Sequence, residues 1–229
     1  MTHALARLAI SQSELFSTWP EDAIGRLVER ADVLEYAPGA CVHGRGDEAQ
    51  YLYLVAAGSL SLLRDGVKDR PFAAGIQLPG DFQGLGPVLS ETPHLYTAVA
   101  KETSVLVRVP GSLLRELVAA NGRLAFSLFR ALERRHLRAL NRFASAALQP
   151  LRARIAELLV SIHARTSRPG AAAEIHLSQD EIAAMLGTRR QVVNRTLKTM
   201  AADGAIQLEY GRLLLQDVAL LEQMAREED

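Results

Sequence analysis

The chain has 229 residues, of which 48% are hydrophobic, and its 26 basic and 26 acidic residues balance to a net charge of zero. This length allows one large domain or two modest ones, and the lack of a basic excess removes the usual whole-chain sign of nucleic-acid binding. The single cysteine, Cys41, excludes a disulfide framework and a four-thiolate iron–sulfur cluster within one chain. Without a signal peptide or an apolar run near about 18 residues, we expect a soluble, cytoplasmic protein with no membrane contact.

The first section of the chain, to about Pro38, is predicted to be helical. Pro20 followed by Glu21 and Asp22 places a proline and two acids in a first helical turn, which is typical of a helix start. The apolar residues that follow recur on one helical face: Ile24, Leu27 and Val28. This section therefore carries at least one amphipathic helix.

From about Gly39 to Val109 the pattern changes to short strands. Nine of the 16 glycines lie between Gly39 and Gly86, where short apolar runs alternate with turns. These runs are YLYLVAAG, SLSLLRDG, AAGIQLPGDF, YTAVA and SVLVRV. In the last run Val105, Val107 and Val109 alternate strictly, as in a half-buried strand. Many short strands at regular spacing predict a small antiparallel sandwich or barrel.

Pro110 ends the β region, and a helix in two parts is predicted after it, with Asn121 and Gly122 as the break. Leucines form a stripe along the second part: Leu124, Leu128, Leu132, Leu137 and Leu140. A long helix after a closed β domain has little to pack on except a second copy, so we expect dimerisation over about residues 121–144. The alternative is that this helix packs only on its own β domain. Residues 145–150 are expected to form a hinge, followed by a helix over residues 151–164.

The segment from Leu177 to Leu215 has the most specific pattern. Ser178 and Glu181 fit a capping box at the start of a helix, and Gly187 suits a tight turn after it. Thr188 is expected to cap a second helix, whose apolar residues face inward at helical spacing: Val193, Leu197 and Met200. Two helices joined by a tight turn predict a helix-turn-helix.

The other face of this second helix is cationic and polar. Arginine pairs bidentately with guanine, and glutamine or asparagine with adenine, so such a helix can lie in the major groove of DNA. We predict six DNA-binding residues: Arg189, Arg190, Gln191, Asn194, Arg195 and Lys198. Gln191 lies three residues after Thr188 and can instead complete a capping box. An ordinary solvated helix face is the alternative for the whole set.

Two short strands, Ala205–Leu208 and Arg212–Leu215, are predicted after these helices, around a turn at Tyr210 and Gly211. Together with the helices they predict a winged helix-turn-helix.

The order of β-barrel, long helix, hinge and winged helix-turn-helix resembles the CRP/FNR family of bacterial transcription regulators. The segments that carry this resemblance are YLYLVAAGSLSLL, GDFQGLG and LSQDEIAAMLGTRRQVVNRTLKTM. The resemblance implies an α+β protein with two domains. An N-terminal antiparallel β-roll of the cupin or jelly-roll type, similar to cyclic-nucleotide-binding domains, would occupy residues 1–146 together with the dimerisation helix. A winged helix-turn-helix domain would occupy residues 147–229.

The same resemblance implies a homodimer that binds a roughly palindromic operator in double-stranded DNA and changes the recruitment of RNA polymerase. Arg195 matches the arginine that reads guanine in this family. Arg190 matches an arginine that reads a base or contacts phosphate in members that respond to cyclic AMP. Gln191 stands where members commonly carry glutamate, so the preferred operator is expected to differ from the usual family half-site at one base pair.

In the effector domain the sequence departs from the family's pattern. The resemblance places a ribose-binding glutamate just after GDF-x-G, where Leu85 stands, and a phosphate-binding arginine where His94 or Leu95 stands. Ala139 and Leu140 replace the polar pair that meets adenine. Because a phosphate charge is not buried cheaply without a cation or donors, we expect an effector other than cyclic AMP or cyclic GMP. The expected pocket is more apolar, and its residues are Leu85, His94, Leu95, Tyr96, Leu137 and Leu140.

Other functions remain as alternatives to effector-controlled DNA binding. We find no P-loop, Rossmann fingerprint, metal-ligand cluster or nucleophile elbow, so we expect no enzyme activity, no bound metal and no resident cofactor. A haem would need an axial ligand, which His94 or His136 could supply. The alternative function is therefore a haem-based gas sensor, or a ligand-binding signalling protein that acts through protein contacts. Cys41 as a redox switch is a weaker possibility, because nothing in the sequence lowers the pKa of its thiol.

Overall fold

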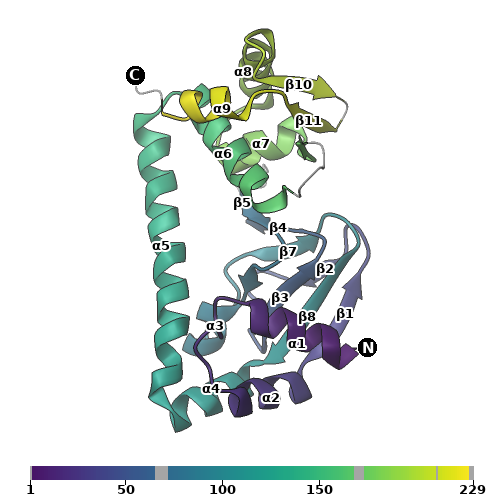
Figure 1. Ribbon diagram of the computed structural model, residues 1–229, viewed down its shortest axis with the longest axis vertical. Coiled ribbons are helices and arrows are strands. Elements are labelled where there is room, and N and C mark those ends of the chain that lie inside the picture. The colour runs from purple at the N-terminus through teal and green to yellow at the C-terminus, as the bar shows by residue number, and fades with distance from the viewer. Residues whose placement is uncertain (1, 65–71, 168–172, 210, 227–229) are drawn as a thin grey trace. The chain divides into compact units, whose positions relative to one another are not determined.

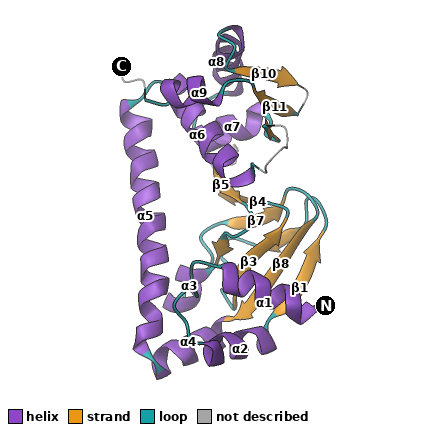
Figure 2. Cartoon of the chain, viewed as in Figure 1, coloured by secondary structure: helices purple, strands orange, loops and turns teal. Residues whose placement is uncertain are grey.

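A computed structural model of the chain describes residues 2–64, 72–167, 173–209 and 211–226. The chain divides into two compact units, Met1–Leu137 and Arg138–Asp229. Helices and strands occur in both units, which confirms the predicted α+β class (Figure 2).

The first unit begins with helices α1 (Thr2–Gln12) and α2 (Glu21–Arg30). The predicted helix start is confirmed, since Pro20 is extended and precedes α2, whose first turn holds two acids. The prediction of helix to about Pro38 is wrong beyond Arg30. Residues Asp32–Tyr36 form strand β1, which pairs along its whole length with β8, about seventy residues away in the sequence. The pairing of these residues with a distant strand outweighs the local sequence pattern, which had suggested a helix.

Within the described residues, eight strands of this unit form two four-stranded antiparallel sheets (Figure 1). The strand order is β1–β8–β3–β6 in the first sheet and β2–β7–β4–β5 in the second. Besides β1, the strands are β2 (Cys41–His43), β3 (Tyr51–Ala57), β4 (Leu60–Arg64), β5 (Phe72–Gln77), β6 (Phe82–Gln83), β7 (Thr97–Ala100) and β8 (Ser104–Pro110). The apolar runs of the sequence are thus confirmed as strands. Between β6 and β7, outside those runs, Leu85–Ser90 forms the short helix α3.

Strand β3 has an apolar core on each of its two faces. Leu52 and Leu54 belong to a core that also includes residues of α1, α2 and the helix after β8. Tyr53 and Val55 belong to a second core, together with residues from β4 and β7 of the other sheet. The second core therefore lies between the sheets, and the helices cover the outer face of the first sheet (Figure 1).

After the sheets come helix α4 (Gly111–Ala120), a 3-10 turn at Gly122–Leu124, and the long helix α5 (Ala125–Leu148). The predicted break at Asn121 and Gly122 is confirmed. The predicted helix end near residue 144 is wrong, because α5 continues to Leu148. The interruption predicted over residues 145–150 lies at the last two of them, and its role as a hinge stays a prediction. Pro150, which is extended, starts the next helix and limits the break to two residues.

The inner face of α5 packs on its own unit, which corrects the predicted leucine stripe. Leu124 and Leu128 are buried in the helix-covered core, with Leu128 only 1% exposed, and Leu132 packs partly against that core. Trp19 Nε1 donates to Ser127 Oγ over 2.9 Å, and the Ser127 hydroxyl donates to the Leu15 carbonyl over 2.6 Å. For this half of the stripe, the alternative of packing on its own β domain is right.

The opposite face of α5 carries large exposed apolar side chains, with the exposed Glu133 among them. In the first unit Phe126 is 64% and Phe129 65% exposed, and Leu137 is exposed as well. The helix continues into the second unit, where Leu140 and Phe143 are also exposed. Helical periodicity places Phe126, Phe129, Leu137 and Leu140 on one face, roughly opposite Leu124 and Leu128, with Phe143 at the edge of that face.

The second unit contains the predicted helices and wing (Figure 1). Its elements after α5 are α6 (Leu151–Thr166), β9 (Glu174–Ile175), α7 (Gln179–Leu186), α8 (Arg190–Ala202), β10 (Ile206–Glu209), β11 (Arg212–Leu215) and α9 (Val218–Met224). Strands β10 and β11 confirm the predicted hairpin, although Tyr210 of its turn lies outside the described residues. Strand β9 pairs with β11 and gives the order β10–β11–β9.

The apolar residues predicted to face inward on the second helix are fully buried: Val193, Leu197 and Met200. In the part of the chain that the structure describes, no helix has the length and hydropathy needed to span a bilayer.

Candidate DNA-binding interface and effector region

Helix α7 begins with the predicted capping box. Ser178 Oγ accepts from the Glu181 amide over 3.2 Å, and the Ser178 amide donates to Glu181 Oε2 over 2.8 Å. The helix ends at Gly187, whose φ of 64° is left-handed and suits a residue without a side chain. Both ends of α7 are therefore fixed by local chemistry, and the turn into α8 is tight.

The predicted cap of α8 is wrong by one residue. Arg189 occupies the N-cap and makes no side-chain capping bond, and α8 begins at Arg190. Thr188 instead belongs to the turn, where its amide donates to the Ala183 carbonyl over 2.9 Å. Because Thr188 is not the cap, Gln191 has no capping-box role and stays available on the outer face of the helix.

Five of the six predicted DNA-binding residues lie on one face of α8, and Arg189 adjoins them at its start. This face is opposite the buried Val193 and Leu197. Arg190, Gln191, Arg195 and Lys198 are exposed, whereas Asn194 is half-buried. A hollow of about 400 Å³ is lined by Arg190, Gln191 and Asn194. The structure thus brings the predicted residues together on a surface that another molecule can reach.

Two side chains of α7 that the sequence analysis missed contact this face. Gln179 Oε1 accepts from Asn194 Nδ2 over 2.7 Å, and Asp180 Oδ2 lies 3.4 Å from Arg190 Nη1. Gln179 and Asp180 stand in the first turn of α7, fifteen and ten residues before their partners. No local pattern links such positions, because the contact depends on the angle at which the two helices meet.

Val192 is a further residue that the sequence analysis missed. It is 44% exposed on α8, although it is apolar and branched. An apolar side chain beside cations can contact the methyl group of thymine in the major groove. Its position one turn before Arg195 could have identified it as a residue of the outer face. A valine next to Val193 in the sequence is, however, easily assigned to the core.

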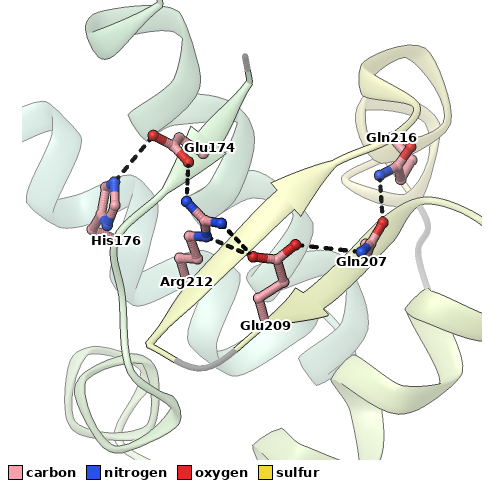
Figure 3. Close-up of polar contacts among 6 residues, drawn as sticks. All are labelled: Glu174, His176, Gln207, Glu209, Arg212 and Gln216. Carbon is pink, nitrogen blue, oxygen red and sulfur yellow. Dashed lines mark hydrogen bonds and ion pairs between the residues drawn. The ribbon is translucent and has the colours of Figure 1, made fainter.

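The wing sheet is cross-linked by polar side chains on all three of its strands (Figure 3). Arg212 Nε donates to Glu209 Oε2 over 2.7 Å, and Arg212 Nη1 lies 3.1 Å from Glu174 Oε2. The bond to Glu209 is the main reason that the pKa of Arg212 is raised. Gln216 donates to Gln207 on β10 over 3.1 Å. Two carboxylates surround this guanidinium, so Arg212 is already neutralised and offers phosphate little net charge.

In the first unit, one residue of the expected effector pocket, His94, is stacked on a second histidine. His94 lies on His43, with ring centroids 3.6 Å apart and planes 12° apart, and both side chains are buried. The His94 amide donates to the Asp47 carbonyl over 2.9 Å, and its Cε1 lies close to Gly84. The residue that stands in place of a phosphate-binding arginine is therefore packed inside the unit.

Both imidazoles are disposed to be neutral. Burial, together with a smaller contribution from the neighbouring His94, lowers the pKa of His43 to about 4. Burial also lowers the pKa of His94, although Asp47 partly opposes this shift. Among the described residues, both ring nitrogens of His43 and Nδ1 of His94 lack a hydrogen-bond partner. Uncharged rings are a poor counterpart for a phosphate, which binds best to a cation.

The remaining residues of the expected pocket have differing environments. Leu85 is 1% exposed within the helix-covered core, whereas Leu95 and Leu137 are exposed and Tyr96 is half-buried. Leu140 belongs to the second unit and is exposed. The pocket assignment stays a prediction. A cavity of about 420 Å³ in the first unit has other lining residues, among them Arg30, Glu48, Tyr51 and Arg115.

The two histidines named as possible haem ligands lie in different surroundings. His94 is covered by His43, and His136 is exposed on α5. Cys41 is exposed on β2. Over residues 2–64, 72–167, 173–209 and 211–226, no group of three or more histidine, cysteine, aspartate or glutamate side chains is placed to hold a metal ion.

Two protein families match this chain, one in each unit. Residues 33–121 match the cyclic nucleotide-binding domain family, and residues 153–224 match the Crp-like helix-turn-helix domain family. The first match covers the two sheets and α4. The second runs from α6 through the wing to α9.

Known regulators are similar to the chain across both regions. The HTH-type transcriptional regulator Cmr of Mycobacterium tuberculosis is 30% identical over 198 residues, which covers 86% of this chain and 77% of the relative. The CRP-like cAMP-activated global transcriptional regulator of that species is 26% identical over 220 residues, covering 95% and 98%. The crystal structure of a CRP-family transcriptional regulator from Thermus thermophilus matches with a TM-score of 0.71 and 27% identity, covering 85% of this chain and 97% of that regulator.

Proposed function

Because the chain belongs to the CRP/FNR family of transcription regulators, we propose that it binds a palindromic DNA operator as a homodimer and responds to an effector other than cyclic AMP. The observation that carries this proposal is the outer face of α8. Arg190, Arg195 and Lys198 are exposed on it, and α8 contains no acidic residue. A helix of this kind suits both the phosphates and the base edges of the major groove.

Within this face we assign Arg195 to a guanine and Lys198 to backbone phosphate. Arg195 is exposed, and a guanidinium matches O6 and N7 of guanine in two parallel hydrogen bonds. Lysine is a compact point charge, which suits phosphate but carries no base pattern. Arg189 and Arg190 stand at the N-terminal end of α8, the end that enters the groove in helix-turn-helix proteins.

The dimer is proposed to form through the outer face of α5. Phe126, Phe129 and Leu137 expose apolar side chains on either side of the exposed Glu133, and this apolar surface is costly in water unless a partner covers it. A two-fold axis beside this helix would pair the surface with its copy, and the two α8 helices could then meet two half-sites. This surface keeps Leu137 from the predicted leucine stripe but not Leu124 and Leu128, because those two are buried within their own unit.

The effector is proposed to differ from cyclic AMP, although one relative is named as cAMP-activated. Leu85 offers no carboxylate to a ribose hydroxyl, and the lowered pKa of His94 keeps its ring uncharged near pH 7. A cyclic phosphate would therefore enter this region without a positive partner at that position. Family membership supports the further proposal that the bound dimer alters recruitment of RNA polymerase.

The experiment that tests the proposal is selection from random DNA duplexes with the purified chain. We expect a palindrome whose half-site centres are one helical turn apart, about 34 Å. Sedimentation of the same sample should give a dimer at micromolar concentration. Recovery of no preferred sequence, or a monomer that binds single half-sites only, would contradict the proposal.

A further inference from the structure

A hydrogen bond between two side-chain amides joins α7 to the outer face of α8. Asn194 Nδ2 donates to Gln179 Oε1 over 2.7 Å, and both side chains are half-buried. Gln179 is the first residue of α7 and directly follows Ser178, whose capping box fixes the backbone at this point. Asn194 is therefore tied to a rigid part of the second unit, before any DNA is present.

This bond leaves Asn194 with a defined set of free polar groups. A side-chain amide has two N–H donors and one carbonyl acceptor, and Gln179 uses one donor. The terminal torsion of asparagine is broad and has two orientations half a turn apart. The structure presents Gln179 Oε1 to this side chain, and only one of the two orientations places Nδ2 against that oxygen. The carbonyl oxygen and the second N–H then remain for another molecule.

We infer that Gln179 is a positioning residue for DNA sequence recognition, which orients the Asn194 amide to recognise adenine at one base pair of each half-site. An adjacent acceptor and donor match the N6 amino group and N7 of adenine in the major groove. Gln179 itself does not touch the base. This inference rests on the proposed function, because it requires α8 to enter the major groove.

Gln191 provides an internal comparison on the same face. It is exposed, and within the described ranges it makes no side-chain hydrogen bond to α7. Its amide can rotate to donate or accept, so it can adapt to more than one base. The hydrogen bond to Gln179 therefore distinguishes the two amides. It orients Asn194 for one base before DNA binds, whereas Gln191 can adapt to more than one.

The test uses the full chain and the operator that it selects from random duplexes. Asn194→Ala first identifies the base pair at which discrimination is lost. Gln179→Met, which keeps the side-chain length but removes the acceptor, is then measured against all four bases at that position. We expect the preference for adenine to fall about tenfold, within the range for one bidentate contact. Preferences at other positions and affinity for random DNA should stay at wild-type values.

Further variants separate positioning from a general structural effect. Gln179→Glu retains an acceptor, so it should keep the adenine preference while its added charge weakens binding to all sequences alike. Gln223→Met makes the same chemical change on the exposed surface of α9 and should alter nothing. Adding Gln179→Met to Asn194→Ala should cause no further loss of discrimination, because the two residues act through one contact.

The possible outcomes separate this inference from the proposed function. If Gln179→Met keeps the full adenine preference, or loses discrimination equally at every position, Gln179 has no positioning role. If the wild-type chain selects no sequence at all, the proposed function fails and this inference fails with it. A selected operator that Gln179→Met reads like the wild type overturns the inference alone.

Discussion

The outer face of α8 and the segment from β6 to His94 differ in the exposure of the side chains that the sequence analysis singled out. On α8, the charged side chains and Gln191 stand exposed on one regular helix, and Val193, Leu197 and Met200 point into the core. Between β6 and His94, Leu85 and His94 are both buried, and His94 is packed on a residue from a distant strand. The residues on an exposed helix face follow directly from their spacing in the sequence. The chemistry of a buried region depends on which other segments pack over it.

The largest expected effect concerns the outer face of α8. Arg195→Ala should abolish preference for the selected operator, because each lost guanine contact is worth about 1–3 kcal/mol and a dimer loses two. Lys198→Ala, a neighbouring cation on the same face, should weaken binding evenly across sequences and reduce the salt dependence. Both are measured as dissociation constants for operator and random DNA over a salt series. Full discrimination by Arg195→Ala would show that α8 does not read the bases.

The second prediction compares the two faces of α5. Leu128→Ala removes a fully buried side chain and should lower the free energy of unfolding by about 2–5 kcal/mol. Phe129→Glu changes a side chain that is exposed in the single chain, so it should lower that free energy only by what dimerisation contributes, while dissociating the dimer and abolishing operator binding. Urea unfolding of each variant and sedimentation at micromolar concentration distinguish the two effects. A dimeric Phe129→Glu would place the interface elsewhere.

The third prediction uses the buried histidine pair. The pKa of His43 in the folded chain is about 4, below its ordinary value near 6.5, so the unfolded chain binds a proton more readily. Stability is therefore complete above about pH 6.5 and falls as pH drops towards 4, by up to about 3 kcal/mol from this group. Below pH 4 this group causes no further loss.

His43→Phe keeps an aromatic ring beside His94 but removes the titration. Urea unfolding at several pH values should then show a flatter profile between pH 6.5 and 4 than the wild type shows. The slope is the readout, so a uniform change in stability caused by the substitution does not affect the test. An unchanged slope would mean that His43 is protonated in the folded unit.

The smallest expected effect is that of cyclic nucleotides. Ligand at a hundred times its dissociation constant would stabilise the chain by about 2.7 kcal/mol, which a thermal melt detects readily. We expect cyclic AMP and cyclic GMP to change neither the melt nor the operator affinity. Leu85 and the uncharged His94 leave the ribose and phosphate without their partners. Saturable micromolar binding in calorimetry, at one site per chain, would return the protein to the cyclic-nucleotide branch of the family.

The sequence alone determined the elements whose chemistry is local. The capping box at Ser178, the left-handed turn at Gly187 and the outward cations of α8 all follow from residue spacing within a single helix or turn. The valine alternation of β8 likewise predicted a strand that the structure contains. Such features are readable because helix and strand periods repeat over a few residues.

Tertiary structure decided the features that join distant segments. It placed β1 against β8, although the sequence there suggested helix, and it assigned the two apolar faces of α5, one to the core and one to solvent. It also stacked His43 on His94 and set Gln179 against Asn194. The periodicity of a single element identifies its apolar residues but not the partner that covers them. That partner is chosen by the packing of all the elements together.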